Sequence, residues 1–257
     1  MTRLAGRIGR FAWEIALPIV VLSYWWLATA DGDNPFFPPA SRVLEAFWSN
    51  WFDERFVSDF LPSMARLGAS YLLAVGIGVG AGLLLRLWRP LGEIVEPLIS
   101  FLRSIPSAAL LPFAVLLFGI GTNMQVFLIT FVCVWPILLN TMDGVADTDP
   151  TMLDTARAFR IGHRRRLTRV VLMAAAPRIA SGMRVSLSVA VVVMLISEMF
   201  ASTNGIGYVT IQAQRTFAFA DMWSGILMLG LLGYLLNLLF VRAERLVLSW
   251  YYASKGR

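Results

Sequence analysis

Cysteine, histidine and lysine are nearly absent from this 257-residue chain, which has one of each: Cys133, His163 and Lys255. A single cysteine excludes an internal disulfide, and this inventory cannot assemble a His/Cys metal site or a paired-histidine metalloprotease. Lys255 is followed by Gly256 at the tail, so the Gly-Lys-Ser/Thr phosphate loop of an ATPase is absent. No nucleophile stands beside a base. We therefore expect no enzyme, and no cofactor or metal in this chain.

Charged residues are scarce as well, at 15% of the chain, whereas 58% of the residues are hydrophobic. Soluble chains are nearer half apolar and about a quarter charged, so the excess apolar surface has to face lipid. The formal net charge is +6. Its arginines cluster between apolar runs, which is typical of cytoplasmic loops and not of a nucleic-acid-binding surface. Membrane lipid is an expected partner, and nucleic acid is not.

Six apolar runs are each long enough to cross the roughly 30 Å of hydrocarbon in a membrane. They lie at about residues 11–30, 61–85, 96–118, 123–142, 179–200 and 222–241. The fold class expected is an all-α, polytopic membrane protein with six transmembrane helices. Arginine-rich connections alternate with arginine-poor ones, so the positive-inside rule predicts that both termini are cytoplasmic.

The first apolar run allows two interpretations. Arginines precede it and Ala28-Thr29-Ala30 ends it, which imitates a signal peptide with a small-residue cleavage site. The run is long enough to span at about 1.5 Å per residue, and Trp25-Trp26 near its outer end resemble an interfacial anchor. An uncleaved first helix is the favoured interpretation.

Apolar side chains recur at helical spacing within residues 41–52, which predicts a short amphipathic helix at the outer membrane face, a structural collar. In the second span, Gly76/Gly80 and Gly78/Gly82 are two overlapping small-xxx-small pairs that point to different sides of the helix. They predict close packing against two neighbouring helices.

Two prolines interrupt the third span. Pro106 and Pro112 each remove a backbone donor and free the carbonyls of Leu102 and Ala108. At membrane depth such carbonyls are tolerated only against protein or a wet cavity. The segment is therefore expected to face the bundle interior, either along the pathway or as a purely structural kink.

Burying a charge at mid-span costs about 2.5–3.5 kcal/mol, so four residues need a reason to be there: Arg66, Arg103, Arg184 and Glu198. Arg184, Ser188 and Glu198 share one stripe of the fifth span, but Arg184 and Glu198 are about 21 Å apart along a helix and cannot pair. Glu198 and Arg66 lie near outer ends, where they form an ion pair, share a water-filled vestibule or merely reach the interface. A pair predicts that reversing both charges rescues a single-charge defect. Arg103 and Arg184 either face the pathway, where they suit an anionic solute, or anchor helix ends.

The stretch 154–172 has good helix formers, with Asp154 at its start and arginines later, as the helix dipole prefers. Ala156 and Phe159 are three residues apart and lie near each other on a helix. We expect a helix of roughly one to three turns outside the membrane, with a small apolar knob. The residues alone are equally consistent with a docking helix and with a solvated, arginine-rich loop.

This stretch, with its acidic residue, alanines, glycine and apolar end at Pro177, resembles the EAA loop of binding-protein-dependent ABC importer permeases. Other pieces extend the resemblance over most of the chain, to the nitrate/sulfonate/taurine/bicarbonate branch of that superfamily. They are Phe37-Pro38-Pro39-Ala40-Ser41, Ser63-Met64-Ala65-Arg66-Leu67-Gly68, Arg103-Ser104-Ile105-Pro106 through Pro112, Phe118-Gly119-Ile120-Gly121, Val170-Val171-Leu172, Glu198 and Gly205-Ile206-Gly207-Tyr208. No one piece is decisive, but their order and spacing together are a strong signal.

The resemblance implies the type I ABC importer permease fold in a single domain, residues 1–257. Residues 1–60 would hold the first span and the collar helix, and 61–250 the core permease with a coupling loop at about 150–170. The loop would seat a coupling helix in a groove of a separate ATPase, through Asp154, Ala156, Arg157, Phe159, Arg160 and Gly162. The pathway or gate candidates are Arg66, Arg103, Pro106, Pro112, Arg184, Ser188 and Glu198.

The resemblance also implies a multi-pass protein of the bacterial cytoplasmic membrane that works with partners. These are two ATPase subunits that hold ATP and Mg, an extracytoplasmic solute-binding protein and a second copy of the chain. The solute expected is a small anion such as a sulfonate, nitrate or a related organic acid. A pyrimidine-like or aromatic solute is an alternative, and so is an ion-coupled secondary transporter, for which Glu198 is the only serious intramembrane acid.

Three positions depart from the family pattern. Asp154 replaces the usual Glu, and Met173 stands where the first of two prolines usually falls. Arg160 stands where the loop glycine is expected, with Gly162 two residues later. This shift puts the turn geometry in doubt, because a residue with a Cβ is strained at positive φ.

Overall fold

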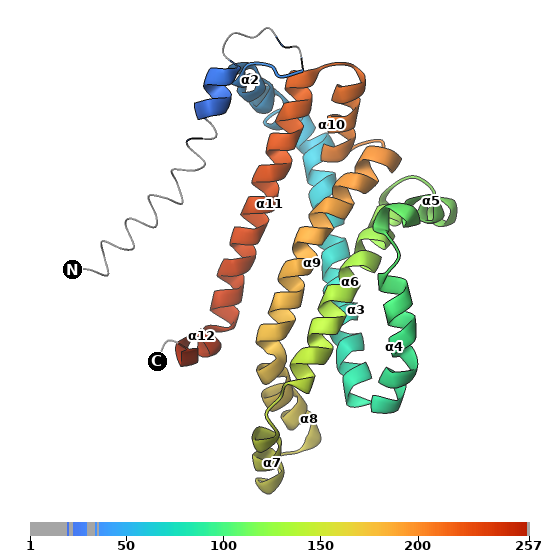
Figure 1. The fold of residues 1–257 in the computed structure, drawn as a ribbon, viewed down its shortest axis with the longest axis vertical. Coiled ribbons are helices and arrows are strands. Elements are labelled where there is room, and N and C mark those ends of the chain that lie inside the picture. The colour runs from blue at the N-terminus through green and yellow to red at the C-terminus, as the bar shows by residue number, and fades with distance from the viewer. Residues whose placement is uncertain (1–19, 21–22, 30–33, 35, 256–257) are drawn as a thin grey trace, which may run out of the picture.

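The computed structural model describes residues 20, 23–29, 34 and 36–255, and every regular element within these residues is a helix (Figure 1). The all-α fold expected from the apolar runs is confirmed. The predicted first span at 11–30 lies largely outside the described residues.

Four helical stretches are long and apolar enough to cross a membrane, and they contain the second, fourth, fifth and sixth predicted spans. They are the π-helical segment η1 (Phe56–Phe60) with α3 (Leu61–Leu87), then α6 (Thr122–Ala146), then α8 (His163–Arg166), η2 (Leu167–Val171) and α9 (Leu172–Ala201) in one run, and α11 (Phe219–Val247). Helix α6 packs along both α3 and α9, so these three form the centre of the bundle (Figure 1).

The interruption predicted in the third span is confirmed at Pro106 but not at Pro112. The span consists of α4 (Arg89–Arg103) and α5 (Ser107–Phe118), which are bent by 95°. Pro106 ends the helical path, because it lacks an N–H and disfavours helical geometry in the preceding residue. The Leu102 carbonyl is not left free, since it accepts the backbone N–H of Ile105 at 3.3 Å. Pro112 lies inside α5 without ending it.

The bent pair decides the span count. If α4 and α5 together make one crossing, the described residues hold five candidate spans, and otherwise four. The predicted six are therefore not reached within the part of the chain that the structure describes.

Short helices mark the two ends of the bundle (Figure 1). Helices α2 (Ala40–Trp51) and α10 (Ile206–Arg215) lie at one end, called the α10 end below, and α7 (Pro150–Ala158) projects from the other, the α7 end. The amphipathic helix predicted at 41–52 is confirmed as α2. Its residues Val43 and Trp51 are buried and Trp48 is exposed. The Asn50 amide donates to Asp221 Oδ1 at 2.7 Å, which fixes α2 to α11.

The glycines of α3 pack closely on one side only. A Cβ on Gly78 would lie 2.8 Å from the Cβ of Ile137, and a Cβ on Gly82 would lie 2.7 Å from the Cβ of Thr141. These two glycines therefore let α3 approach α6 closely, as predicted. A Cβ on Gly76 or Gly80 meets nothing within 4 Å, so the second predicted contact is absent from the described residues.

We expect Gly78→Ala to destabilise the protein by about 1–3 kcal/mol, the usual cost of overpacking, because Ile137 and the Val134 carbonyl block the added Cβ. Gly80→Ala is the matched control on the open side of the same helix. Thermal unfolding in detergent measures both variants. Equal unfolding temperatures for the two would show that the α3–α6 contact does not set this stability.

Candidate functional site

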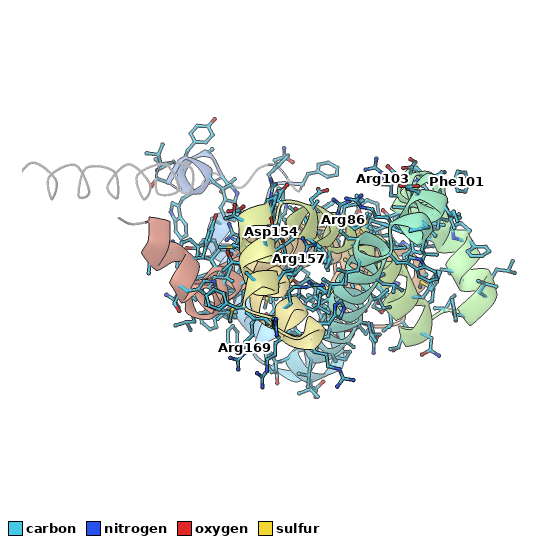
Figure 2. The ribbon with its side chains drawn as sticks, turned by 90° about the horizontal axis from the view of Figure 1, so that it is seen from below. Arg86, Phe101, Arg103, Asp154, Arg157 and Arg169 are labelled. Atoms are coloured by element: carbon cyan, nitrogen blue, oxygen red, sulfur yellow. The ribbon has the colours of Figure 1, made fainter. Side chains whose placement is uncertain are left out.

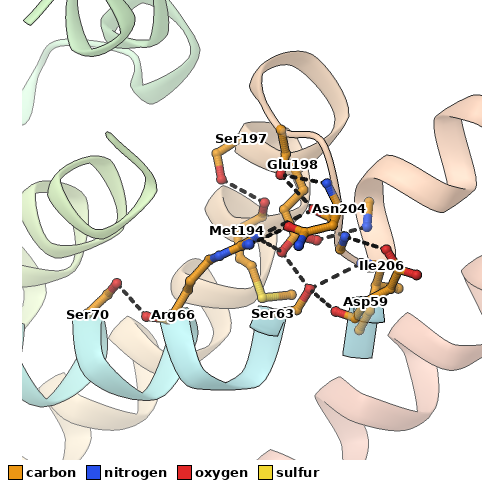
Figure 3. A network of polar contacts seen from close by, with 12 residues as sticks. Asp59, Ser63, Arg66, Ser70, Met194, Ser197, Glu198, Asn204 and Ile206 are labelled. Atoms are coloured by element: carbon orange, nitrogen blue, oxygen red, sulfur yellow. Dashed lines mark hydrogen bonds and ion pairs between the residues drawn. The ribbon is translucent and has the colours of Figure 1, made fainter. Parts of the chain in front are cut away.

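A buried polar network joins α3, α9 and the start of α10 (Figure 3). Glu198, near the end of α9, is fully buried and Arg66 of α3 is 8% exposed, with Arg66 Nη1 3.5 Å from Glu198 Oε1. The predicted ion pair is confirmed. The alternative that both side chains merely reach the membrane interface is wrong, because neither is exposed.

The Glu198 carboxylate also accepts two hydrogen bonds. The Ser63 hydroxyl lies 2.5 Å from Oε1, and the backbone N–H of Gly207 donates to Oε2 at 2.9 Å. Gly207 belongs to the first turn of α10, where unpaired N–H groups and the helix dipole favour a negative charge. A buried carboxylate is tolerated when it is paired and hydrogen-bonded, and this one has donors on both of its oxygens.

One glycine makes room for that carboxylate, and a second lets the start of α10 approach α9. Gly205 has φ +121°, and a Cβ there would lie 2.5 Å from Glu198 Cδ. A Cβ on Gly207 would lie 2.7 Å from the Leu195 carbonyl oxygen. The Gly-Ile-Gly sequence is thus required by the close wrapping of the chain around Glu198.

Two further members of the network are Asp59 and Asn204, which the sequence did not single out. Asp59 accepts the Gly205 N–H at 2.9 Å. Arg66 donates to the Asn204 side chain and, at 3.4 Å, to its carbonyl oxygen. We call Asp59, Ser63, Arg66, Glu198, Asn204, Gly205 and Gly207 the Glu198 network. It unites the sequence piece at 63–68 with the two neighbouring pieces at 198 and 205–208, which lie far from it in the chain.

The remaining pathway candidates do not gather at one site. Arg184 pairs with Glu244 of α11, so its charge is compensated rather than free for a solute. Glu244 also accepts the hydroxyl of Tyr252 at 2.9 Å, and this bond raises the pKa of Tyr252, which stays a donor. Arg103 and Ser188 are exposed and lie on different helices, α4 and α9.

A short helix is present near the predicted one, but α7 covers Pro150–Ala158 and so overlaps the predicted stretch 154–172 only over its last five residues. Asp149 caps it by accepting the Thr151 N–H at 2.8 Å, and Asp154 pairs with Arg157 at 2.8 Å on the exposed surface (Figure 2). The predicted apolar knob is wrong in part, because Ala156 is only 2% exposed while Phe159 is 77% exposed. Of these two residues, Phe159 alone offers an apolar side chain to a partner, and Met152 of α7 is also exposed, at 54%.

Ala156 faces a groove of about 540 Å³ between α7, the start of α9 and the last described helix, α12 (Ser249–Lys255). Apolar side chains from all three contribute, among them Met152, Met173 and Trp250, and Ile161 adds to them from the turn after α7. Met173, which replaces a family proline, thus lines this groove.

The turn after α7 places its strain at Arg160, which has φ +50°. The Ile161 N–H donates to the Ala156 carbonyl at 2.9 Å and the Arg160 N–H donates to the Arg157 carbonyl at 2.9 Å. This is the Schellman arrangement that ends many helices, and it normally has glycine at the Arg160 position. Gly162 has φ −59°, which any residue adopts. Gly162 therefore does not take over the role of the family's loop glycine. Arg160 itself adopts the left-handed conformation.

Comparison with known proteins gives a family and several relatives. Residues 74–250 match the family described as the binding-protein-dependent transport system inner membrane component. The chain is 27% identical over 239 residues to the taurine transport system permease protein TauC of Escherichia coli, covering 90% of this chain and 87% of that one. It is 24% identical over 251 residues to the putative aliphatic sulfonates transport permease protein SsuC of Bacillus subtilis, covering 96% and 91%. It is 30% identical over 189 residues to the bicarbonate transport system permease protein CmpB of Synechococcus elongatus, covering 73% and 68%.

Solved structures with a similar fold include inward-facing conformations of the MetNI methionine ABC transporter. One such chain has a TM-score of 0.65 and 21% identity, over 74% of this chain and 94% of that one. A chain in the crystal structure of an amino acid ABC transporter has a TM-score of 0.52 and 18% identity, over 72% and 90%.

We expect Glu198→Gln to destabilise the protein by about 1–3 kcal/mol, because the amide keeps the shape but opposes its own N–H groups to the buried donors around it. Ser197→Ala is the control, since this equally buried neighbour bonds only the Met194 carbonyl of its own helix. Unfolding temperatures of the purified chain measure the effect, and a loss as large in Ser197→Ala would contradict it.

The double variant Arg66→Glu/Glu198→Arg is expected not to restore stability, contrary to what a simple pair predicts. An arginine at position 198 would face the N–H groups of the α10 helix start, where a positive charge is unfavourable. Rescue by the double reversal would show that the ion pair outweighs the backbone donors.

We expect Arg160→Gly to stabilise the turn after α7 by about 1 kcal/mol, because glycine adopts positive φ without strain. Gly162→Ala is the control. It should be tolerated, because the backbone at Gly162 is compatible with alanine and a Cβ added there meets nothing within 4 Å. Amide hydrogen exchange of residues 156–162 measures the local stability. Faster exchange in Gly162→Ala than in Arg160→Gly and the unchanged chain would assign the special backbone to Gly162 instead.

Proposed function

Since the chain belongs to the family of inner-membrane components of binding-protein-dependent transport systems and is a permease subunit of an ABC importer, we propose that two copies of it form the path of a small anion across the membrane. The type I importer permease fold implied by the resemblance is confirmed. The observation that carries the proposal is the family match over residues 74–250, which includes α7, Glu198 and α10.

Two ATPase subunits and an extracytoplasmic binding protein complete the proposed complex. This chain holds no phosphate loop, so the nucleotide would bind to the ATPase partner. We place both termini and the α7 end in the cytoplasm, as the distribution of arginine favours. The α10 end then faces the binding protein.

Helix α7 is the proposed coupling helix. It projects from the bundle beyond the long helices, is joined to α6 and α9 by short turns and exposes Phe159, Asp154 and Arg157 (Figures 1 and 2). An ATPase groove that grips Phe159 would pull α7 when two ATPase subunits close on nucleotide. Ala156 would act indirectly, by seating α7 on the groove of its own chain. The bundle would then rock between inward-open and outward-open states.

The proposed solute is a small anion such as a sulfonate, nitrate or a related organic acid. Relatives at 24–30% identity are named for aliphatic sulfonates, taurine and bicarbonate. Arg103 supports an anion, because it is exposed and forms no ion pair with another described residue.

The rival reading as an ion-coupled transporter loses its principal support in Glu198. A carboxylate that exchanges a proton or sodium ion has to be reachable from an aqueous cavity. Glu198 is fully buried, and its oxygens are engaged by Ser63, Arg66 and Gly207.

In proteoliposomes with the ATPase partner and a binding protein, we expect ATP-dependent uptake of taurine or another small sulfonate, and at least tenfold less uptake by Phe159→Ala. Loss of the exposed phenyl ring removes the apolar contact with the ATPase but nothing from the packed bundle. Phe200→Ala is the control. Phe200 is also exposed, at 68%, but it lies at the end of α9 that is remote from α7.

Uptake without any ATPase would overturn the assignment as an ATP-driven importer. Normal uptake by Phe159→Ala would contradict only the role of α7. Transport of a pyrimidine and not of any sulfonate, nitrate or bicarbonate would replace the proposed solute class.

A further inference from the structure

Helix α4 carries all its charges on one face. Arg89, Glu93, Glu96, Ser100 and Arg103 follow one another at intervals of four, three, four and three residues, which places them on one side of a helix. All five are exposed. We call these five residues the polar stripe of α4.

The rest of α4 is apolar. Ile99 is buried against the bundle, while Ile94, Leu98 and Phe101 are exposed. Figure 2 shows Phe101 and Arg103 at the edge of the molecule formed by α4, away from the α7 residues Asp154 and Arg157. One exposed face of α4 therefore suits lipid, and the other does not.

The charged side chains of the polar stripe, those of Arg89, Glu93, Glu96 and Arg103, form no salt bridges within the part of the chain that the structure describes. A charge that faces lipid is costly, so such residues in membrane helices face the bundle interior or a water-filled cavity. Helix α4 runs alongside α3 instead of lying flat across an end of the bundle (Figure 1), so an interfacial position does not explain Glu96, Ser100 and Arg103, which lie within the predicted third span.

The stripe borders a polar cleft at one end and reaches the break between α4 and α5 at the other. Near the α3–α4 connection, Arg89, Glu93 and Glu96 border a cleft of about 230 Å³ together with Arg86 and Met142. A polar cleft of this size has room for several water molecules, at about 30 Å³ each. At the far end, Arg103 is the last residue before the break at which α5 turns away by 95°.

We propose that the polar stripe of α4 lines the water-filled part of the solute path on the α7 side of the membrane. Arg103 lies at the end of the stripe that is deepest in the membrane. This inference rests on the proposed function, because it assigns one wall of the path that two copies of the chain would form. Arg103 presents a positive charge to an anion at the break. Nearer the exit, Glu93 and Glu96 balance Arg86 and Arg89, so the anion is not held there.

Thiol accessibility tests this assignment in the assembled, nucleotide-free complex. Ser100→Cys and Leu98→Cys are a matched pair, because the two positions lie two residues apart at nearly the same depth and on different faces of α4. Both are exposed within one copy of the chain. The unchanged protein gives the background, since its single cysteine, Cys133, is fully buried. The probe is a permanently charged methanethiosulfonate that carries a trimethylammonium group and reacts only in water.

We expect Ser100→Cys to react at least tenfold faster than Leu98→Cys. Equal rates, or a faster reaction of Leu98→Cys, would overturn the assignment. The assignment would also be overturned if Ser100→Cys did not react with the probe and instead formed a disulfide between two copies of the chain on oxidation. The stripe would then be an interface between the copies. ATP-dependent uptake, measured in the same vesicles, tests the proposed function separately, since the ratio of the two reaction rates does not depend on it.

Discussion

Hydrocarbon offers no hydrogen bonds, so each polar group that lies at membrane depth has to find its partner within the protein or in a pocket of water. Glu198 shows how far this constraint shapes the bundle. Its carboxylate is satisfied only where α3 supplies Ser63 and Arg66 and the start of α10 supplies the Gly207 N–H. Separating any of these elements would leave a buried charge without its donors. The α10 end of the bundle is therefore fastened by one cooperative network.

The α7 end is joined in a different way. Arg178 and Asp147 connect α9 to the end of α6 at 3.1 Å, but both side chains are more than half exposed, and an exposed pair contributes only about 0–1 kcal/mol. The groove beneath α7 is lined mostly by apolar side chains. A force applied to α7 thus meets weaker joints than one applied to α10, which favours motion of the α7 end about a firm α10 end.

The sequence specified the spans but not how they face one another. Apolar runs predict length and depth, and so the stretches that became α3, α6, α9 and α11 were found. The predicted spans also place Arg66 and Glu198 at a similar depth in the membrane. The orientation of each side chain about its helix axis is set by packing, so the sequence leaves an ion pair as one of three possible arrangements. Asp59 was missed although Asp59, Ser63 and Arg66 follow at intervals of four and three, which is one helix face. Pro106 predicts a break in the third span. The missing backbone N–H does not determine the angle between α4 and α5, which is 95°.

The turn after α7 shows why local rules alone do not settle such a site. Glycine is preferred where φ is positive, and this preference pointed to Gly162 as the displaced family glycine. The chain instead keeps the turn at Arg160, because the two hydrogen bonds to the Ala156 and Arg157 carbonyls fix where the helix ends. Ile161 can then line the groove beside Ala156. Moving the turn by two residues would carry Ile161 away from that groove, so the strain at Arg160 is offset by the seating of α7.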